Sequence, residues 1–138
     1  MQLYKKILVT IDCSSVDDSI IEHVTAIALQ NNASVYLLHV VHSHTLDQQR
    51  VLGERANLCL ESYRKKLEDQ GIDAHIVIRD GEPEKQILDE IKEKDYDLVA
   101  MATHGHKFIG DFLFGSVSKS LKHKIKIPLL LLRSECKS

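Results

Sequence analysis

The chain has 138 residues, 43% of them hydrophobic and 28% charged, which is the length and composition of one ordinary globular domain, so we expect residues 1–138 to form a single domain. Eighteen basic residues against twenty acidic ones give a formal net charge of −2, which argues against nucleic acid as the main partner, because nonspecific nucleic-acid binders usually carry a basic excess. No apolar run approaches the roughly 18 residues needed to cross a bilayer, so we expect no membrane partner either.

Short apolar runs alternate with segments of helical periodicity from the N-terminus onward. The run KKILVTI (5–11) is rich in β-branched residues and predicts a strand buried on both faces. Residues 14–32 repeat apolar side chains at helical spacing, and Ser15 and Asp18 have the spacing of a capping box. SVYLLHVV (34–41) predicts a second strand.

The middle of the chain continues the same alternation. Residues 46–70 predict a long helix with one apolar stripe, and Gly71 follows it at a position typical of a C-cap. IDAHIVI (72–78) predicts a third strand. Another helix is expected to start at Glu82-Pro83, because proline is favoured in the first turn of a helix.

Two more strands and a short helix complete the pattern. YDLVAMA (96–102) predicts a fourth strand, a helix is expected at about 116–123, and IPLLLLR (127–133) predicts a last strand. Strands that alternate with helices favour right-handed crossovers and a parallel sheet. The predicted fold class is therefore α/β, with a parallel sheet covered by helices on both faces.

A glycine-containing loop separates the fourth strand from the last helix. Ligands of open parallel sheets collect at the carboxyl ends of the strands, which is where this loop begins. Gly115 and Ser116 stand at the start of the last helix, where free N–H groups favour an anion. The pattern predicts a loop that wraps a phosphorylated ligand. The alternative is that the glycines merely end a strand and that Ser116 caps a helix.

The motifs KKILVTID, VYLLHVV, DGEPEKQILDEI and YDLVAMATHG resemble the universal stress protein family in order and spacing along essentially the whole chain. The ATP-binding branch of that family carries a glycine, two residues, a second glycine, nine residues, and then Gly-Ser or Gly-Thr. Gly105, the nine residues 106–114 and Gly115-Ser116 match this spacing. Ala102 stands where the family has its first glycine. A methyl group at this position costs about 1 kcal/mol or more if the backbone needs a positive φ, and otherwise only crowds the ligand.

The resemblance implies an open five-stranded parallel sheet of strand order 3-2-1-4-5, as in adenine nucleotide alpha hydrolase-like proteins, and a dimer through the last strand (residues 127–133). It also implies a bound adenine nucleotide, ATP or AMP, whose phosphates carry Mg²⁺ or Mn²⁺. The nucleoside would lie against Thr10, Ile11, Asp12, Val40, Met101 and Ala102. The phosphates would lie against Gly105, Gly115, Ser116, Val117 and Ser118, with His104 as a further candidate contact.

The cysteines and two of the histidines are further candidates for chemistry. Cys13, Cys59 and Cys136 are odd in number and widely spaced, so we expect no disulfide framework and a reducing, cytoplasmic location. For Cys13, a small buried residue is the expected role and a redox-sensitive thiol beside the ligand is the alternative. His42 and His44 could share a metal, but no set of ligands accompanies them, so we expect a solvated or capping role.

The sequence has no Walker A lysine motif, and no Asp or Gln can be placed beside a γ-phosphate. Together with the resemblance, this favours a nucleotide-binding regulatory module of the stress response, in which the ligand orders the loop 103–115. A weak ATPase and a nucleotide-free dimeric interaction module are the alternatives.

Overall fold

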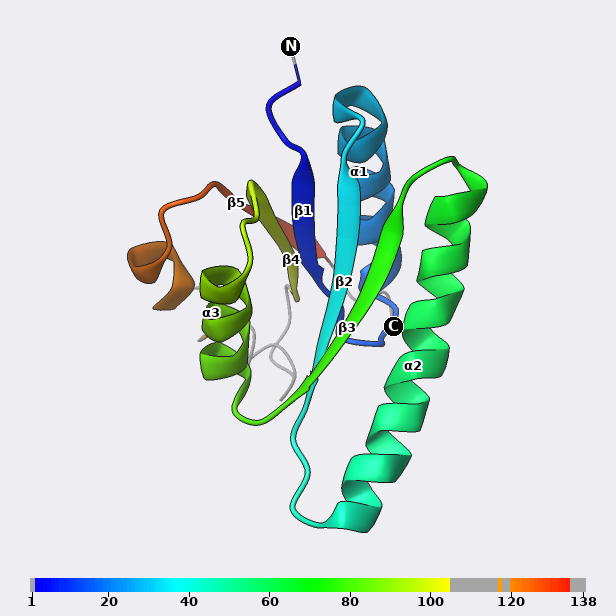
Figure 1. Cartoon of the computed structure of the whole chain (residues 1–138), viewed down its shortest axis with the longest axis vertical. Coiled ribbons are helices and arrows are strands. Elements are labelled where there is room, and N and C mark those ends of the chain that lie inside the picture. The colour runs from blue at the N-terminus through cyan, green and yellow to red at the C-terminus, as the bar shows by residue number, and fades with distance from the viewer. Residues whose placement is uncertain (1, 105–116, 118–119, 135–138) are drawn as a thin grey trace.

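The computed structural model describes residues 2–104, 117 and 120–134. The elements follow one another as strands and helices (Figure 1): β1 (Lys6–Thr10), α1 (Asp17–Asn31), β2 (Ser34–Val41), α2 (Leu46–Asp69), β3 (Ala74–Asp80), α3 (Pro83–Glu93), β4 (Leu98–His104) and β5 (Leu129–Ser134). Val117 and residues 120–124 are helical, within the segment predicted as the last helix. No helix in this described part of the chain is long and apolar enough to span a membrane.

The five strands form one parallel sheet in the order β3-β2-β1-β4-β5, as expected. The central strand β1 pairs with β2 on one side and with β4 on the other, so the winding of the sheet reverses between β1 and β4. Parallel α/β sheets bind their ligands outside the carboxyl ends of the strands at such a reversal.

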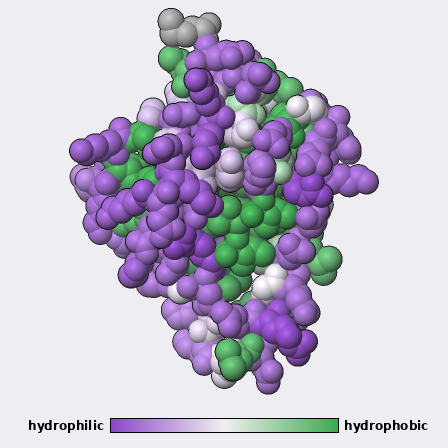
Figure 2. All heavy atoms as spheres, in the orientation of Figure 1, coloured by the Kyte–Doolittle hydropathy of each residue, from purple (hydrophilic) through white to green (hydrophobic). Residues whose placement is uncertain are grey.

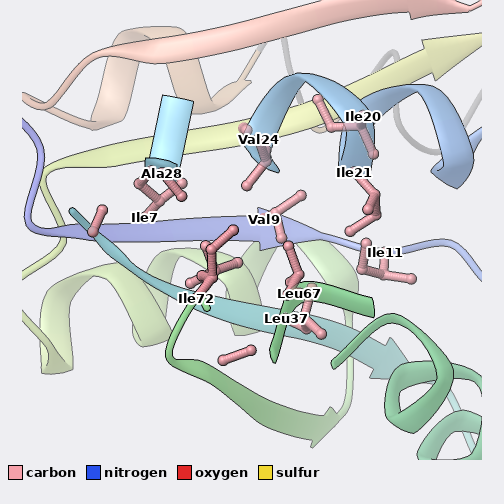
Figure 3. Packing of buried hydrophobic residues seen from close by; sticks show 14 of the residues in the cluster. Ile7, Val9, Ile11, Ile20, Ile21, Val24, Ala28, Leu37, Leu67 and Ile72 are labelled. Carbon is pink, nitrogen blue, oxygen red and sulfur yellow. The ribbon is translucent and has the colours of Figure 1, made fainter. Parts of the chain in front are cut away.

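Each face of the sheet has its own core. On one face, α1 and α2 cover alternate residues of β1, β2 and β4 (Figure 3), and on the other face α3 and the helical residues Val117 and Leu121 cover the intervening ones. This alternation places Val9, Ala100 and Ala102 on the α1 side, and Leu8 and Met101 on the α3 side. Both faces are therefore apolar, which explains why the strands are continuous hydrophobic runs.

The surface is less uniform than the core. Figure 2 shows that most of the viewed face is hydrophilic and that an apolar area lies between α3 and α2, over β2 and β3. Val40 of β2 and Val77 of β3 are only partly buried in the cluster on the α3 side. The α3 side of the sheet is therefore incompletely covered at these two strands.

Several predicted boundaries differ from the structure. The third, fourth and fifth strands each begin two residues later than predicted, at Ala74, Leu98 and Leu129. Before β4, the Asp97 carboxylate accepts hydrogen bonds from the backbone N–H groups of Lys5 and Lys6, at 2.8 and 3.0 Å. Asp97 thus caps the start of β1, a contact between distant segments that a local pattern does not contain.

The predicted capping box at Ser15 and Asp18 is wrong. Helix α1 begins at Asp17, and Val16 occupies the N-cap position without a side-chain hydrogen bond. The carboxylate of Asp17 instead accepts from the backbone N–H groups of Asp12 and Ser14, at 2.9 and 3.0 Å. The acid at the start of α1 therefore holds the preceding loop and not the first turn of the helix.

Candidate functional site

A pocket lies at the carboxyl ends of β1 and β2, beside the start of α3, with a cavity volume of about 80 Å³. Its lining combines apolar residues with the three polar residues Thr10, Asp12 and His39. The lining residues are Thr10, Ile11, Asp12, Leu38, His39, Val40, Pro83, Ile87 and Val117. An apolar pocket with a few convergent polar groups is the usual form of a small-molecule site.

The hydroxyl of Thr10 is the unusual polar group of this pocket. Thr10 is the last residue of β1 and is only 5% exposed. Within the described residues, its Oγ1 is the one buried side-chain oxygen or nitrogen without a hydrogen-bond partner. Buried hydroxyl groups are nearly always paired, because leaving one unpaired costs about 1–3 kcal/mol. A polar ligand atom in the pocket could supply the missing partner.

The loop after β1 presents Asp12 at the pocket and is fixed by its own hydrogen bonds. The Asp12 carboxylate accepts from the Ser14 hydroxyl at 3.2 Å, and Asp17 holds the backbone on either side of Cys13. Asp17 is almost fully buried, and this burial raises its pKa from 3.8 to about 6, against the lowering effect of the backbone N–H groups. Repulsion from the Asp12 carboxylate adds to the increase.

His39 is oriented by the same loop. Its Nδ1 lies 2.7 Å from the carbonyl oxygen of Ile11, and because a carbonyl can only accept, Nδ1 carries a hydrogen. In the neutral ring, Nε2 is then an acceptor. The pocket therefore offers the acceptors of Asp12 and the donor and acceptor of Thr10, which suits a ligand with amino and hydroxyl groups.

The structure brings together five of the residues predicted for the ligand site: Thr10, Ile11, Asp12, Val40 and Val117 all line the pocket. Met101 is fully buried in the same cluster as Val117 and does not line the pocket.

Ala102 lies in the core on the opposite face of the sheet, and its φ is not positive. The methyl group that departs from the family pattern therefore packs against the core and carries no backbone strain. Of the other predicted residues, Gly105, Gly115, Ser116 and Ser118 lie outside the described residues, as does the side chain of His104.

Four pocket residues were not predicted as site residues, namely Leu38, His39, Pro83 and Ile87. The local pattern predicts core positions at Leu38 and Ile87 and the start of a helix at Pro83, so it gives no sign that these residues belong to a site. His39 lies inside the run predicted as the second strand, which carries no local signal of a site residue. Only the packing of α3 against β2 shows that these residues meet the end of β1.

His42 and His44 lie close together after β2. The rings of His42 and His44 are 5.0 Å apart, centroid to centroid. No group of three or more His, Cys, Asp or Glu side chains among the described residues could hold a metal ion.

The expectation that Cys13 is a small buried residue was wrong. Cys13 is exposed, and it forms a disulfide with Cys59 of α2, 46 positions away, with the two Cα atoms 6.1 Å apart. The pairing depends on how α2 crosses the sheet near the loop after β1, so the spacing of the cysteines did not reveal it. Cys136 lies outside the described residues.

The sheet order and the helices on both of its faces define a Rossmann-like α/β protein. The model of the universal stress protein family matches residues 3–133, so the chain belongs to this family. A curated relative, universal stress protein YxiE of Bacillus subtilis, is 26% identical over 148 residues that cover 95% of this chain and all of the relative.

Solved structures agree with this assignment. The structure of MJ0577, a universal stress protein of Methanocaldococcus jannaschii, has a TM-score of 0.84 and 27% identity, and the match covers 98% of this chain and 99% of that one. A universal stress protein of Archaeoglobus fulgidus in complex with dAMP matches at a TM-score of 0.68 and 18% identity, over 94% of this chain and 98% of that one. A universal stress protein in complex with cAMP matches at 0.71 and 18%, over 94% and 97%. At such identities the last two show the shared fold.

Proposed function

We propose that this protein binds an adenine nucleotide in the pocket at the end of β1 and acts as a regulatory module of the stress response. The observation that carries the proposal is the buried hydroxyl of Thr10, which lacks a partner among the described residues and lies in the wall of a pocket that also contains Asp12. The family membership and the dAMP and cAMP complexes of two structural neighbours support the same ligand class.

In this proposal the nucleoside occupies the pocket. Val40 and Ile87 provide apolar walls for the base, and the Asp12 carboxylate accepts from its amino group or from a ribose hydroxyl. The Thr10 hydroxyl pairs with a further polar atom of the nucleoside. The incomplete cover of β2 and β3 leaves room beside the pocket on the same side of the sheet.

The phosphates are assigned to the loop that follows β4. We propose that Gly105, Gly115, Ser116, Val117 and Ser118 hold them, with the divalent ion, Mg²⁺ or Mn²⁺, bound to the phosphates themselves. The resemblance of these residues to the ATP-binding branch of the family supports ATP as the first candidate, with AMP or another adenine nucleotide as the alternative. Calorimetric titration of the purified protein with ATP, ADP, AMP and cAMP tests both the ligand class, adenine nucleotides, and the choice of ATP within it. Adenine nucleotide released by denaturing the purified protein would support the class, and the absence of binding to all four would refute it.

The Thr10→Val variant tests directly whether the buried hydroxyl of Thr10 contacts the ligand. Because valine has the shape of threonine without the hydroxyl, we expect the affinity for the bound nucleotide to fall roughly 5- to 10-fold, as for the loss of one hydrogen bond. The free energy of unfolding should stay the same or rise by about 1 kcal/mol, since an unpaired hydroxyl is removed from the interior. Calorimetry and urea unfolding give the two values.

Ala102→Gly is the matched control for this experiment. The methyl group of Ala102 packs in the core on the far side of the sheet, so we expect an unchanged affinity and a loss of about 0.5–1 kcal/mol of stability, as for glycine inside a strand. An unchanged affinity in Thr10→Val would show that the hydroxyl does not contact the ligand. A large gain in affinity in Ala102→Gly would show that the methyl group crowds the ligand.

We also propose a homodimer through β5 and a cytoplasmic location. β5 pairs only with β4 and forms one edge of the sheet, where Leu131 is 44% exposed. An apolar edge strand needs cover to avoid nonspecific association. Leu131→Lys should shift the protein from dimer to monomer in sedimentation equilibrium. A monomeric wild-type protein, or a variant that remains dimeric, would contradict the proposed interface.

A further inference from the structure

A disulfide joins the wall of the pocket to the long helix on the opposite face of the sheet. Cys13 follows Asp12 in the loop between β1 and α1, and its sulfur is bonded to that of Cys59 in α2. Cys13 is exposed and Cys59 is partly buried, so a small thiol reagent in solvent can reach the Cys13 sulfur first. The bond therefore connects an exposed residue, next to the site residue Asp12, to α2.

The backbone at Cys13 has a conformation that needs support. Its φ is 61°, in the left-handed region that residues with side chains seldom occupy. The N–H groups on either side, those of Asp12 and Ser14, are held by the carboxylate of Asp17. The disulfide is a further link that holds this loop, and it ties the loop to α2.

His39 lies beside the same sulfur. Its Nδ1 is 3.9 Å from the Sγ of Cys13, and it carries the hydrogen that is donated to the carbonyl of Ile11. After reduction, the same N–H can also be donated to the thiolate of Cys13. Donors next to a cysteine favour the thiolate, which is the reactive form.

We propose that Cys13 and Cys59 form a reversible thiol–disulfide switch, which fixes the loop at the wall of the pocket when oxidised and releases it when reduced. The proposed change in the loop rests on the positions of the two cysteines, the loop and His39. Its effect on ligand binding rests, in addition, on the nucleotide-binding function proposed above.

The oxidant of this reaction is a small disulfide such as oxidised glutathione. The Cys13 thiolate attacks one sulfur of the small disulfide, which forms a mixed disulfide and expels one thiolate. The Cys59 thiolate then attacks the Cys13 sulfur, which forms the internal disulfide and expels the second thiolate. Two protein thiols are oxidised, one small disulfide is reduced to two thiols, and the protons of the protein thiols leave with these products.

The test uses the full-length protein, reduced with dithiothreitol and then treated with oxidised glutathione. Thiol titration should fall from three groups to one, and peptide mapping should find Cys13 joined to Cys59. The control variant Cys136→Ser should form the same bridge. Cys59→Ser should instead stop at a mixed disulfide of Cys13 with glutathione, seen as a mass increase. A bridge to Cys136, or one between two chains, would overturn the proposal.

Hydrogen exchange then reports on the loop. We expect the amides of Asp12 and Ser14 to exchange roughly tenfold more slowly in the oxidised protein than in the reduced protein. Equal rates in both states would overturn the switch even if the bridge forms. Titration of both forms with ATP separates the two proposals. A several-fold difference in affinity supports the link to the ligand, and equal affinities refute that link. If neither form binds any adenine nucleotide while the exchange rates differ, the proposed function fails and the switch stands.

Discussion

Replacing Glu90 by alanine is expected to lower the free energy of unfolding by about 3 kcal/mol, as when one partner of a buried ionic network is removed. Glu90 lies on α3 and is only 1% exposed. Its carboxylate accepts from the Tyr96 hydroxyl at 2.6 Å, from Arg79 at 2.9 Å and from Lys94 at 2.9 Å. These contacts join the end of α3 to β3 and to the segment before β4, so alanine would leave a phenol and two cations without their shared acceptor.

The pH dependence of this effect follows from the pKa of Glu90. Burial alone would raise that pKa, but the hydrogen bonds from Tyr96, Lys94 and Arg79 outweigh burial and hold it below its usual range. A carboxyl group with a lowered pKa in the folded state stabilises the fold above its ordinary pKa, and this contribution is lost as the pH falls through the lowered value. We therefore expect the stability difference between wild type and Glu90→Ala to be largest at neutral pH and to shrink in acid.

Asp89→Ala provides a matched control on the same helix. Asp89 is 32% exposed and pairs with Lys85 one turn away at 2.8 Å, a contact of the kind that contributes little in solvent. Urea unfolding at pH 7 should show a change of less than about 0.5 kcal/mol for this variant. Equal losses in Asp89→Ala and Glu90→Ala would show that the network adds nothing beyond an exposed ion pair.

Asp17→Asn is expected to change how stability depends on pH. Because the pKa of Asp17 is raised to about 6 in the folded protein, the unfolded chain releases this proton at lower pH than the folded chain does. The stability that this group contributes is full below its ordinary pKa of 3.8 and is lost as the pH rises through about 6. Asparagine does not titrate, so the stability gap between wild type and variant should shift by about 2 kcal/mol in favour of the variant between pH 4 and pH 7.

Urea unfolding across this pH range measures the shift, and Asp18→Asn is the control. Asp18 is the next residue of α1, is exposed, and only accepts a hydrogen bond from Tyr63 at 3.2 Å. Its variant should follow the wild-type pH profile closely. A gap between wild type and Asp17→Asn that stays constant, or that moves in favour of wild type, would contradict the raised pKa.

The local patterns of the chain could be predicted from the sequence, and the contacts between distant segments could not. The alternation of apolar runs such as KILVT with helical stripes predicted a parallel sheet, because both faces of such a sheet must be covered. The strand order was implied by the family resemblance. Thr10, Asp12 and Val40 were predicted for the ligand site by the family resemblance, and all three line the pocket.

The sequence by itself therefore determined the fold class, because the alternation of strands and helices depends on the spacing of residues along single segments. The strand order and five of the nine pocket residues were implied by the family resemblance. Only the tertiary structure decided that Ile87 and His39 complete the pocket, that Ala102 faces the core, that Asp17 holds the loop after β1, and that Cys13 bonds Cys59. Asp17 reaches the backbone of Asp12 and Ser14, five and three residues before it, through the turn of the loop that precedes α1. The other contacts depend on how the helices and strands pack together. That packing is fixed by side chains distant in sequence, so the spacing of residues within one segment does not predict it.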